Sequence, residues 1–201
     1  MLFKPPPLEL APHVWLLAQC VDTAVLRPHI EAVAAQAPFR HMVVPGGHTM
    51  KVALTNCGAY GWTSDEKAYR YSALDPASGQ PWPAMPAVFA QLARSTAEQC
   101  GFAGFEPDAC LVNRYVAGAG VGLHQDRNER DFTQPIVSVS IGAPCKFILG
   151  GLLRSDATRS FTLSDGDVMV WGGAARLVFH GVRPLPVSSG VRHNITLRKA
   201  M

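Results

Sequence analysis

The pattern of apolar and polar positions divides the chain into two unlike parts. Residues 28–37 and 86–100 have helical composition, and each segment begins with a proline, which suits the first turn of a helix. From residue 109 onward, short apolar segments alternate with turn residues such as Gly, Pro, Asp and Ser. Short strands with such punctuation favour a sandwich or a barrel. The predicted strands are residues 109–116, 135–142, 144–149, 158–163, 167–171, 175–180 and 191–198.

The first part of the chain is less regular. Residues 1–12 predict an extended, proline-stiffened arm, and residues 49–55 predict a strand after a Pro-Gly-Gly turn. Residues 56–85 mix several aromatic side chains with Gly and Pro, a composition that suits a surface or a lid more than a core strand. We therefore expect one globular unit of the α+β class, mainly β. In it, residues 1–105 form an N-terminal extension with a lid at about residues 40–85, and residues 106–201 form the β-rich core.

Composition and charge add limits. Hydrophobic residues make up 48% of the chain, which is enough for a sizeable core. No segment approaches the roughly 18 apolar residues that span a bilayer, and residues 1–7 lack the pattern of a signal peptide. Five scattered cysteines without a C-x-x-C motif argue against a disulfide framework or a zinc–thiolate site. We expect a soluble, cytoplasmic protein without a membrane partner, and its net charge of +3 permits a polyanionic partner without requiring one.

His124-Gln125-Asp126 is the first motif that could carry chemistry. In an extended chain, positions i and i+2 point to the same face, so His124 and Asp126 could share one metal ion. A hydrogen-bonded pair on the surface is the alternative. His180 lies far downstream, at the end of an apolar segment, where a buried structural histidine is the alternative. Together, two histidines and one carboxylate form the facial triad of non-haem iron(II) oxygenases, which leaves open positions for a cosubstrate and dioxygen.

Two predicted strands present polar faces that suit an anionic cosubstrate. Two arginines on one strand face can receive a dicarboxylate, because guanidinium matches carboxylate geometry, although an exposed strand face gives the same pattern. On the strand at 109–116, Asn113 and Tyr115 share a face, and the tyrosine hydroxyl could bind a carboxylate or lie at the rim of the core. On the last strand, Arg192, Asn194, Thr196 and Arg198 alternate with His193, Ile195 and Leu197.

These residues resemble those of the AlkB-type DNA dealkylases, a branch of the iron(II)/2-oxoglutarate dioxygenases. The similarity runs from about residue 35 to residue 198. Its motifs include Pro38-Phe39-Arg40, Pro45-Gly46-Gly47, Thr55-Asn56-Cys57-Gly58, Gly61-Trp62-Thr63, Pro81-Trp82-Pro83, Asn113-Arg114-Tyr115, Leu123-His124-Gln125-Asp126, Pro135-Ile136-Val137-Ser138, Trp171-Gly172-Gly173 and the alternating segment from Arg192 to Arg198.

The resemblance implies a double-stranded β-helix (jelly-roll) core, helical N-terminal support and a nucleotide-recognition lid. It also implies iron(II), 2-oxoglutarate and dioxygen as cofactor and cosubstrates. The catalytic iron ligands would be His124, Asp126 and His180. Arg198 and Tyr115 would hold the distal carboxylate of 2-oxoglutarate, while Arg192, Asn194 and Asn113, with Thr196 on the same strand face, would complete the pocket near its other end.

The resemblance also implies contacts with the substrate. Trp62 would stack on a flipped, alkylated base opposite His124, although an aromatic that clamps the lid is the alternative. Tyr69 and Arg154 would lie near the substrate strand. Two positions after the metal aspartate the family carries an aspartate, but this chain has Asn128, which predicts an altered lesion preference. Lys51, Lys67, Arg70 and Arg127 are candidate phosphate contacts.

The implied activity is oxidative dealkylation of bases such as 1-methyladenine and 3-methylcytosine in single- or double-stranded DNA, by a monomer. 2-Oxoglutarate would be decarboxylated to succinate while the alkyl group is hydroxylated and leaves as an aldehyde. The same chemistry on RNA or on a protein side chain is the alternative. Trp62 in an aromatic lid argues for a base, but nothing in the sequence separates DNA from RNA. A third hypothesis is a catalytically inactive β-helix that binds nucleic acid. The presence of all three metal ligands and of Arg198 argues against it.

Overall fold

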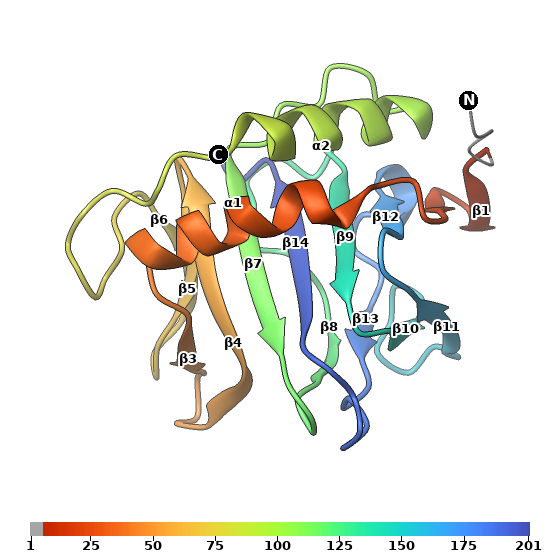
Figure 1. Ribbon diagram of the computed structural model, residues 1–201. Coiled ribbons are helices and arrows are strands. Elements are labelled where there is room, and N and C mark those ends of the chain that lie inside the picture. Colours follow the sequence, from red (N-terminus) through yellow and green to blue (C-terminus); the bar gives the residue numbers. More distant parts are fainter. Residues whose placement is uncertain (1–5) are drawn as a thin grey trace.

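Eight strands form one large antiparallel sheet that lies between a pair of helices and a smaller sheet (Figure 1). The computed structural model of the chain describes residues 6–201, so residues 1–5 of the predicted arm lie outside the described part. Strands from the N-terminal half extend the large sheet at both edges. In order across the sheet, the strands are β1 (Leu8–Ala11), β2 (Val14–Leu17), β12 (Val168–Trp171), β9 (Ile136–Gly142), β14 (Arg192–Arg198), β7 (Ala109–Tyr115), β4 (Thr49–Gly58) and β3 (Arg40–Val43).

The smaller sheet faces the large one and closes the predicted jelly roll. Between the two sheets, Ile136, Met169 and Trp171 of the large sheet belong to the same buried cluster as Phe147 and Leu163 of the small one. The small sheet has the order β11 (Arg159–Leu163), β10 (Cys145–Leu149), β13 (His180–Val182) and β8 (Val121–His124). A separate hairpin is formed by β5 (Gly61–Ser64) and β6 (Tyr69–Ser72) within the segment expected to be a lid.

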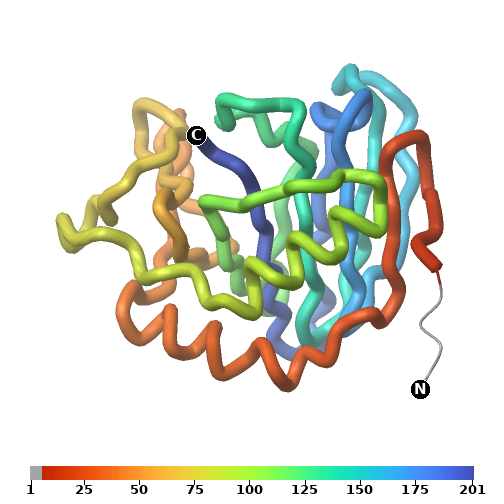
Figure 2. The backbone as a smooth tube through the Cα atoms, turned by 90° about the horizontal axis from the view of Figure 1, so that it is seen from above, coloured from red at the N-terminus to blue at the C-terminus, as the bar shows by residue number. Residues whose placement is uncertain are grey.

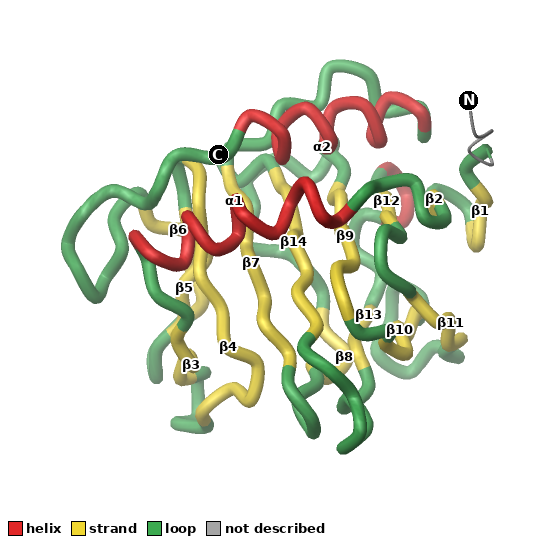
Figure 3. Tube along the Cα trace, viewed as in Figure 1, coloured by secondary structure: helices red, strands yellow, loops and turns green. Residues whose placement is uncertain are grey.

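Two helices, α1 (Thr23–Gln36) and α2 (Ala87–Gln99), cover the other face of the large sheet. Figure 3 shows both in red, crossing the sheet on the same side. Their apolar side chains, among them Ile30 and Phe89, join Val139 and Ile195 of the sheet in a second buried cluster. The large sheet is therefore buried on both faces, and its residues alternate between the helices and the small sheet.

The helix boundaries differ in how well the sequence predicted them. For α2 the prediction is confirmed, with Pro86 immediately before the helix and Gly101 past its end at φ 87°. For α1 the predicted start at residue 28 is wrong. The helix begins five residues earlier, because the Asp22 side chain accepts a hydrogen bond from the Ala24 amide and caps the N-terminus. Pro28 therefore lies inside the helix.

The strand predicted at residues 175–180 is also wrong. A short 3-10 helix, η1 (Gly173–Ala175), and a turn occupy this segment, and β13 begins only at His180. Arg176 explains the difference: its side chain is buried, and it donates hydrogen bonds to the carbonyl oxygens of Asp126 and Gln134. These bonds draw the backbone inward before the strand starts. Strands β1, β2, β3, β5, β6 and β8 were not predicted.

The N-terminal segment lies beside the C-terminal half of the chain. In Figure 2 it is the red segment next to the blue and cyan ones, and β2 pairs with β12 along its length. Among residues 6–201, none of the helices is both long and apolar enough to cross a membrane.

Candidate active site

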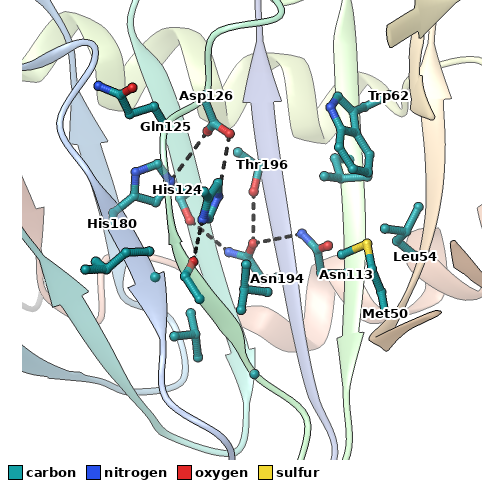
Figure 4. A pocket seen from close by; sticks show the side chains of 18 of the residues that line it. Met50, Leu54, Trp62, Asn113, His124, Gln125, Asp126, His180, Asn194 and Thr196 are labelled. Atoms are coloured by element: carbon teal, nitrogen blue, oxygen red, sulfur yellow. Dashed lines mark hydrogen bonds and ion pairs between the residues drawn. The ribbon is translucent and has the colours of Figure 1, made fainter. Parts of the chain in front are cut away.

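The register of the small sheet places two histidines side by side. β13 pairs with β8 in antiparallel fashion, and His180 lies directly opposite His124. Asp126 follows β8, and its carboxylate oxygens lie 3.8 Å from His124 Nε2 and 3.6 Å from His180 Nε2. One potential ligand atom from each side chain lies within 4.8 Å of the others. Figure 4 shows the three side chains pointing toward one another, while Gln125 points away, as predicted from the H-x-D spacing.

Both imidazoles are oriented by their second nitrogen. His124 Nδ1 lies 2.9 Å from the Gly122 carbonyl oxygen, and His180 Nδ1 lies 3.1 Å from that of Val178. A carbonyl can only accept, so each Nδ1 carries the hydrogen and each Nε2 keeps its lone pair for a metal. Burial, together with the neighbouring His124, lowers the pKa of His180 to about 4. His180 is therefore a neutral imidazole, the form that binds metals.

The third ligand is held as an ionised carboxylate. Burial alone would raise the pKa of Asp126, but Arg198 and the two histidines lower it well below its usual range. Arg198 Nη2 donates a hydrogen bond of 2.8 Å to Asp126 Oδ2. Two imidazoles and one carboxylate on one surface suit iron(II), so the residues fit the metal that the sequence implies.

One pocket of about 750 Å³ contains this triad and all the predicted cosubstrate residues. Its floor is a satisfied hydrogen-bond network centred on Asn194, whose Oδ1 accepts from Asn113 Nδ2 at 3.3 Å and from Thr196 Oγ1 at 2.9 Å. The Asn194 amide donates in turn to Ser138 Oγ at 2.8 Å. These bonds fix the polar face of β14 that the alternation in the sequence predicted.

Arg192 lies in the same pocket with hydrogen-bond donors that have no partner. Only 1% of the residue is exposed. Its Nη2 donates to Ser140 Oγ at 3.1 Å, but its Nε and Nη1 are buried without a hydrogen-bond acceptor. No carboxylate among residues 6–201 pairs with it. An unpaired buried cation is costly, so this site fits an anionic group such as a carboxylate of 2-oxoglutarate.

The two arginines serve opposite ends of the pocket, which corrects one prediction. Arg198 and Tyr115 were expected to hold the same carboxylate. The β14–β7 register instead places Arg192 opposite Tyr115 and Arg198 opposite Ala109. The Arg192 guanidinium lies 4.9 Å from the centre of the Tyr115 ring. Six residues of strand separate the two arginines by about 20 Å along the backbone, and Arg198 lies at the metal end.

The predicted substrate residues Trp62, Tyr69, Asn128 and Arg154 also line the pocket. Trp62 and Tyr69 are stacked, with ring centres 5.5 Å apart and planes inclined by 20°. Trp62 Nε1 donates to Asn128 Oδ1 at 3.3 Å, and Figure 4 shows the indole across the pocket from His124. The aromatic wall and the metal ligands therefore face one space.

The basic residues predicted to lie near the substrate differ in whether they line the pocket and in whether they form an ion pair. Lys51 and Arg127 line it, and their contact with phosphate stays a prediction. Arg70 forms an ion pair of 2.6 Å with Asp65 and does not line it. Arg154 Nη1 donates to the Leu123 carbonyl at 3.0 Å.

Sequence reasoning missed a buried charge cluster beneath the metal ligands. Glu129 is paired with Arg176 at 3.1 Å and accepts a hydrogen bond of 2.6 Å from the Tyr71 hydroxyl. Arg198 Nε lies 3.5 Å from the same carboxylate. Glu129 stands in a charged stretch that reads as a solvated surface, so no signal in the sequence marks it as buried.

The family model described as the 2OG-Fe(II) oxygenase superfamily matches residues 14–198. The chain belongs to this superfamily. Within the superfamily it is an AlkB-type, iron(II)- and 2-oxoglutarate-dependent dioxygenase, as its sequence predicted, and iron(II), 2-oxoglutarate and dioxygen are its cofactor and cosubstrates.

Relatives of this dioxygenase cover most of its length. The alpha-ketoglutarate-dependent dioxygenase AlkB of Salmonella typhimurium is 52% identical over 173 residues, which are 84% of this chain and 80% of the relative. The AlkB homolog of Caulobacter vibrioides is 44% identical over 203 residues, 96% of this chain and 90% of the relative. The solved structure of OsALKBH1 superposes with a TM-score of 0.80 at 25% identity and covers 96% of this chain and 100% of that one.

Proposed function

We propose that this dioxygenase removes alkyl groups from N-alkylated nucleic-acid bases, with 1-methyladenine and 3-methylcytosine in DNA as substrates. The observation that carries the proposal is the stacked Trp62–Tyr69 pair, which lines the same pocket as the metal ligands. An enzyme that acts on a base must take it out of the stack. A planar aromatic wall replaces part of the lost stacking, which is worth roughly 1–3 kcal/mol per base. The substrates printed in the names of two relatives support the same class: one is the nucleic acid dioxygenase ALKBH1 of Homo sapiens, and the other is the DNA N(6)-methyladenine demethylase ALKBH1C of Arabidopsis thaliana.

The residues of the pocket divide the work of holding the reactants. Arg192 and the Tyr115 hydroxyl would hold the far carboxylate of 2-oxoglutarate, since two of the Arg192 nitrogens are buried without an acceptor. Burial raises the pKa of Tyr115, although Arg192 opposes this, so the phenol stays neutral and can donate. Arg198 keeps Asp126 in place at the metal end.

The base is held on the opposite side of the pocket. Trp62 offers its indole ring, and the hydrogen bond from its Nε1 to Asn128 fixes the orientation of that ring. When bound, iron(II) with 2-oxoglutarate and dioxygen supplies the oxidation of the alkyl carbon. Hydroxylation at that carbon would give a hemiaminal that releases an aldehyde and the restored base, and 2-oxoglutarate would be converted to succinate and CO2.

A turnover assay tests this function. A DNA oligonucleotide that contains 1-methyladenine or 3-methylcytosine, and a matched RNA, are incubated with iron(II), 2-oxoglutarate and air, and the nucleosides are measured by mass spectrometry. We expect loss of the methyl group from DNA. The loss should vanish in His124→Ala and Asp126→Ala and persist in His29→Ala, which changes a histidine on α1 far from the pocket. Intact oligonucleotides beside steady succinate production would mean that the substrate is of another class.

A further inference from the structure

The turn between β10 and β11 carries two exposed leucines beside the active-site pocket. Leu152 is 54% exposed and Leu153 is 64% exposed. The next residue, Arg154, lines the pocket. Single exposed leucines are common on protein surfaces and need no explanation, but here two are consecutive and stand at the rim of a binding site.

This turn is held firmly by its own hydrogen bonds and by bonds to the neighbouring segment. The Leu153 amide donates to Asp156 Oδ2 at 2.9 Å, and the Asp156 amide donates to the Leu153 carbonyl at 3.0 Å. Two further backbone bonds join Phe179 to the glycines before the leucines, at 2.7 Å with Gly150 and 2.8 Å with Gly151. The leucines are therefore presented by an ordered backbone, which lowers the entropy cost of using them in binding.

The same turn is fixed relative to the metal ligands. Gln125, which lies between two of the ligands, donates from Nε2 to the Leu177 carbonyl at 2.6 Å and the Leu152 carbonyl at 3.4 Å. Arg154 donates to the carbonyl of Leu123, the residue before His124, and its guanidinium lies 4.9 Å from the centre of the Phe179 ring. Phe179 in turn precedes His180. The leucines thus keep a constant position next to the place where the reacting base must sit.

We propose that Leu152 and Leu153 form an apolar wedge that enters the base stack of a nucleic-acid duplex beside the nucleotide held in the pocket. This inference rests on the proposed function. Proteins that unstack bases insert apolar side chains of this kind, and an extruded base leaves a gap that such side chains can fill. Arg154 next to the leucines supplies a cation for the backbone phosphates. Two leucines are far too small a surface for a stable protein partner, which needs hundreds of square ångströms on each side.

The test compares a substrate whose lesion lies in a base stack with a short substrate that has no duplex stack to open. One is a DNA duplex with a single 3-methylcytosine, and the other is a methylated trinucleotide. In the double variant Leu152→Ser/Leu153→Ser we expect kcat/KM on the duplex to fall by about tenfold or more, because an unfilled gap disfavours the extruded state. On the trinucleotide we expect the kcat/KM of the variant to equal that of the wild type within about twofold, because no base stack has to be opened.

Two control variants separate the wedge from a general loss of activity. Leu152→Met/Leu153→Met keeps the apolar volume and should retain most of the duplex activity. Val187→Ser removes a side chain that is 90% exposed on a loop outside the pocket lining. This variant should leave kcat/KM unchanged on both substrates.

A binding signal provides a second readout that does not depend on turnover. 2-Aminopurine placed next to the lesion in the duplex becomes brighter when it is unstacked. With Mn(II) in place of iron(II), the wild type at saturation should brighten it, and the double serine variant at saturation should leave it near the level of the unbound duplex. Equal effects of the variant on both substrates, or unchanged brightening, would overturn the wedge and leave the proposed function intact. Failure of the wild type to demethylate either substrate would overturn both.

Discussion

A single guanidinium, that of Arg192, carries the strongest evidence for the anion that the pocket binds. It is buried, and two of its nitrogens have no acceptor. We expect Arg192→Met to raise the KM for 2-oxoglutarate by roughly 100-fold, since hydrogen bonds to charged groups contribute about 1.5–3 kcal/mol each. At saturating 2-oxoglutarate, kcat should change little.

The same substitution should affect folding in the opposite direction. Without 2-oxoglutarate, the free energy of unfolding should rise, because an uncompensated buried charge has been removed. Urea unfolding with and without 2-oxoglutarate measures both effects. Arg183→Met, which removes an exposed arginine, is the matched control. An unchanged KM would show that Arg192 does not bind the cosubstrate.

Asn128 stands at the position where the resemblance to the AlkB-type family predicts an aspartate. It accepts a hydrogen bond from Trp62 and lines the pocket as an uncharged amide. Asn128→Asp keeps the acceptor and adds a negative charge beside the base. We expect kcat/KM for cationic lesions such as 1-methyladenine to rise by about tenfold relative to neutral lesions such as 3-methylthymine, since about 1.4 kcal/mol is a tenfold effect.

Competition between the two lesions in one reaction measures this ratio directly. Gln36→Glu introduces the same change of charge on α1, away from the pocket, and should leave the ratio unchanged. If Asn128→Asp also left it unchanged, the lesion preference would have another origin.

At the scale of elements, the β5–β6 hairpin is tied to the metal site through Tyr71. The Tyr71 hydroxyl donates to Glu129 at 2.6 Å and accepts from Arg198 Nη1 at 3.4 Å. Burial raises the pKa of Tyr71, although Arg198 opposes this, so the phenol remains a donor. Tyr71→Phe should cost about 1–3 kcal/mol of unfolding free energy, because it leaves buried charges short of a partner.

Hydrogen exchange locates that loss. In Tyr71→Phe, the amides of residues 61–72 should exchange faster, while those of α2 should keep their protection. Tyr60→Phe removes a hydroxyl that forms no hydrogen bond to the described residues. It should leave the amide exchange rates of both segments unchanged. Uniform loss of protection across the chain would mean that Tyr71 stabilises the whole fold and has no special link to the hairpin.

The loop after β6 is tied to β3 by an ion pair with a buried carboxylate, and this pair makes stability depend on pH. Asp75 accepts a 2.7 Å contact from Arg40 Nη1 and a 2.9 Å bond from the Ala77 amide. Burial alone would raise the pKa of Asp75. The hydrogen bonds from Arg40 and Ala77 outweigh this effect, so the pKa lies below its ordinary value of 3.8. A carboxyl whose pKa is depressed on folding stabilises the fold above its unfolded pKa, and the contribution disappears as the pH falls through the folded pKa.

We therefore expect the free energy of unfolding to fall as the pH drops below about 4, and to fall less steeply in Asp75→Asn. Urea unfolding at a series of pH values measures both slopes. Asp156→Asn, which changes a carboxyl in the β10–β11 turn without an ion pair among the described residues, provides the control for loss of a hydrogen-bonded aspartate. Identical slopes for wild type and Asp75→Asn would assign the acid sensitivity to other carboxyls.

Strands with a strict alternation of polar and apolar residues could be predicted from the sequence. Element boundaries that depend on contacts between distant residues could not. β14 was predictable because its residues alternate between the pocket and the core that contains Ile195 and Leu197. The start of β13 was not, because it depends on the burial of Arg176. The metal ligands could be named from their residue types, but their meeting depends on the β13–β8 register. The same limit explains why the arginine at the metal end was misassigned.

At the scale of the whole molecule, the net charge of +3 is modest, so the contribution of charge to nucleic-acid binding depends on where the basic residues lie. Lys51, Arg127 and Arg154 all line the pocket. If each of the three contacts one phosphate of a single strand, the slope of log affinity against log salt should be about −2, since each contact contributes about −0.7.

Titrations of a fluorescent oligonucleotide at several salt concentrations measure the slope for each variant. Lys51→Ala, Arg127→Ala and Arg154→Ala should each flatten it by about 0.7, and the weakening should not depend on base sequence. Lys199→Ala removes a cation paired with Asp108 outside the pocket lining and should leave the slope unchanged. A slope near zero in the wild type would mean that stacking on Trp62 dominates binding. The selectivity of the enzyme would then reside in the aromatic wall and not in its charges.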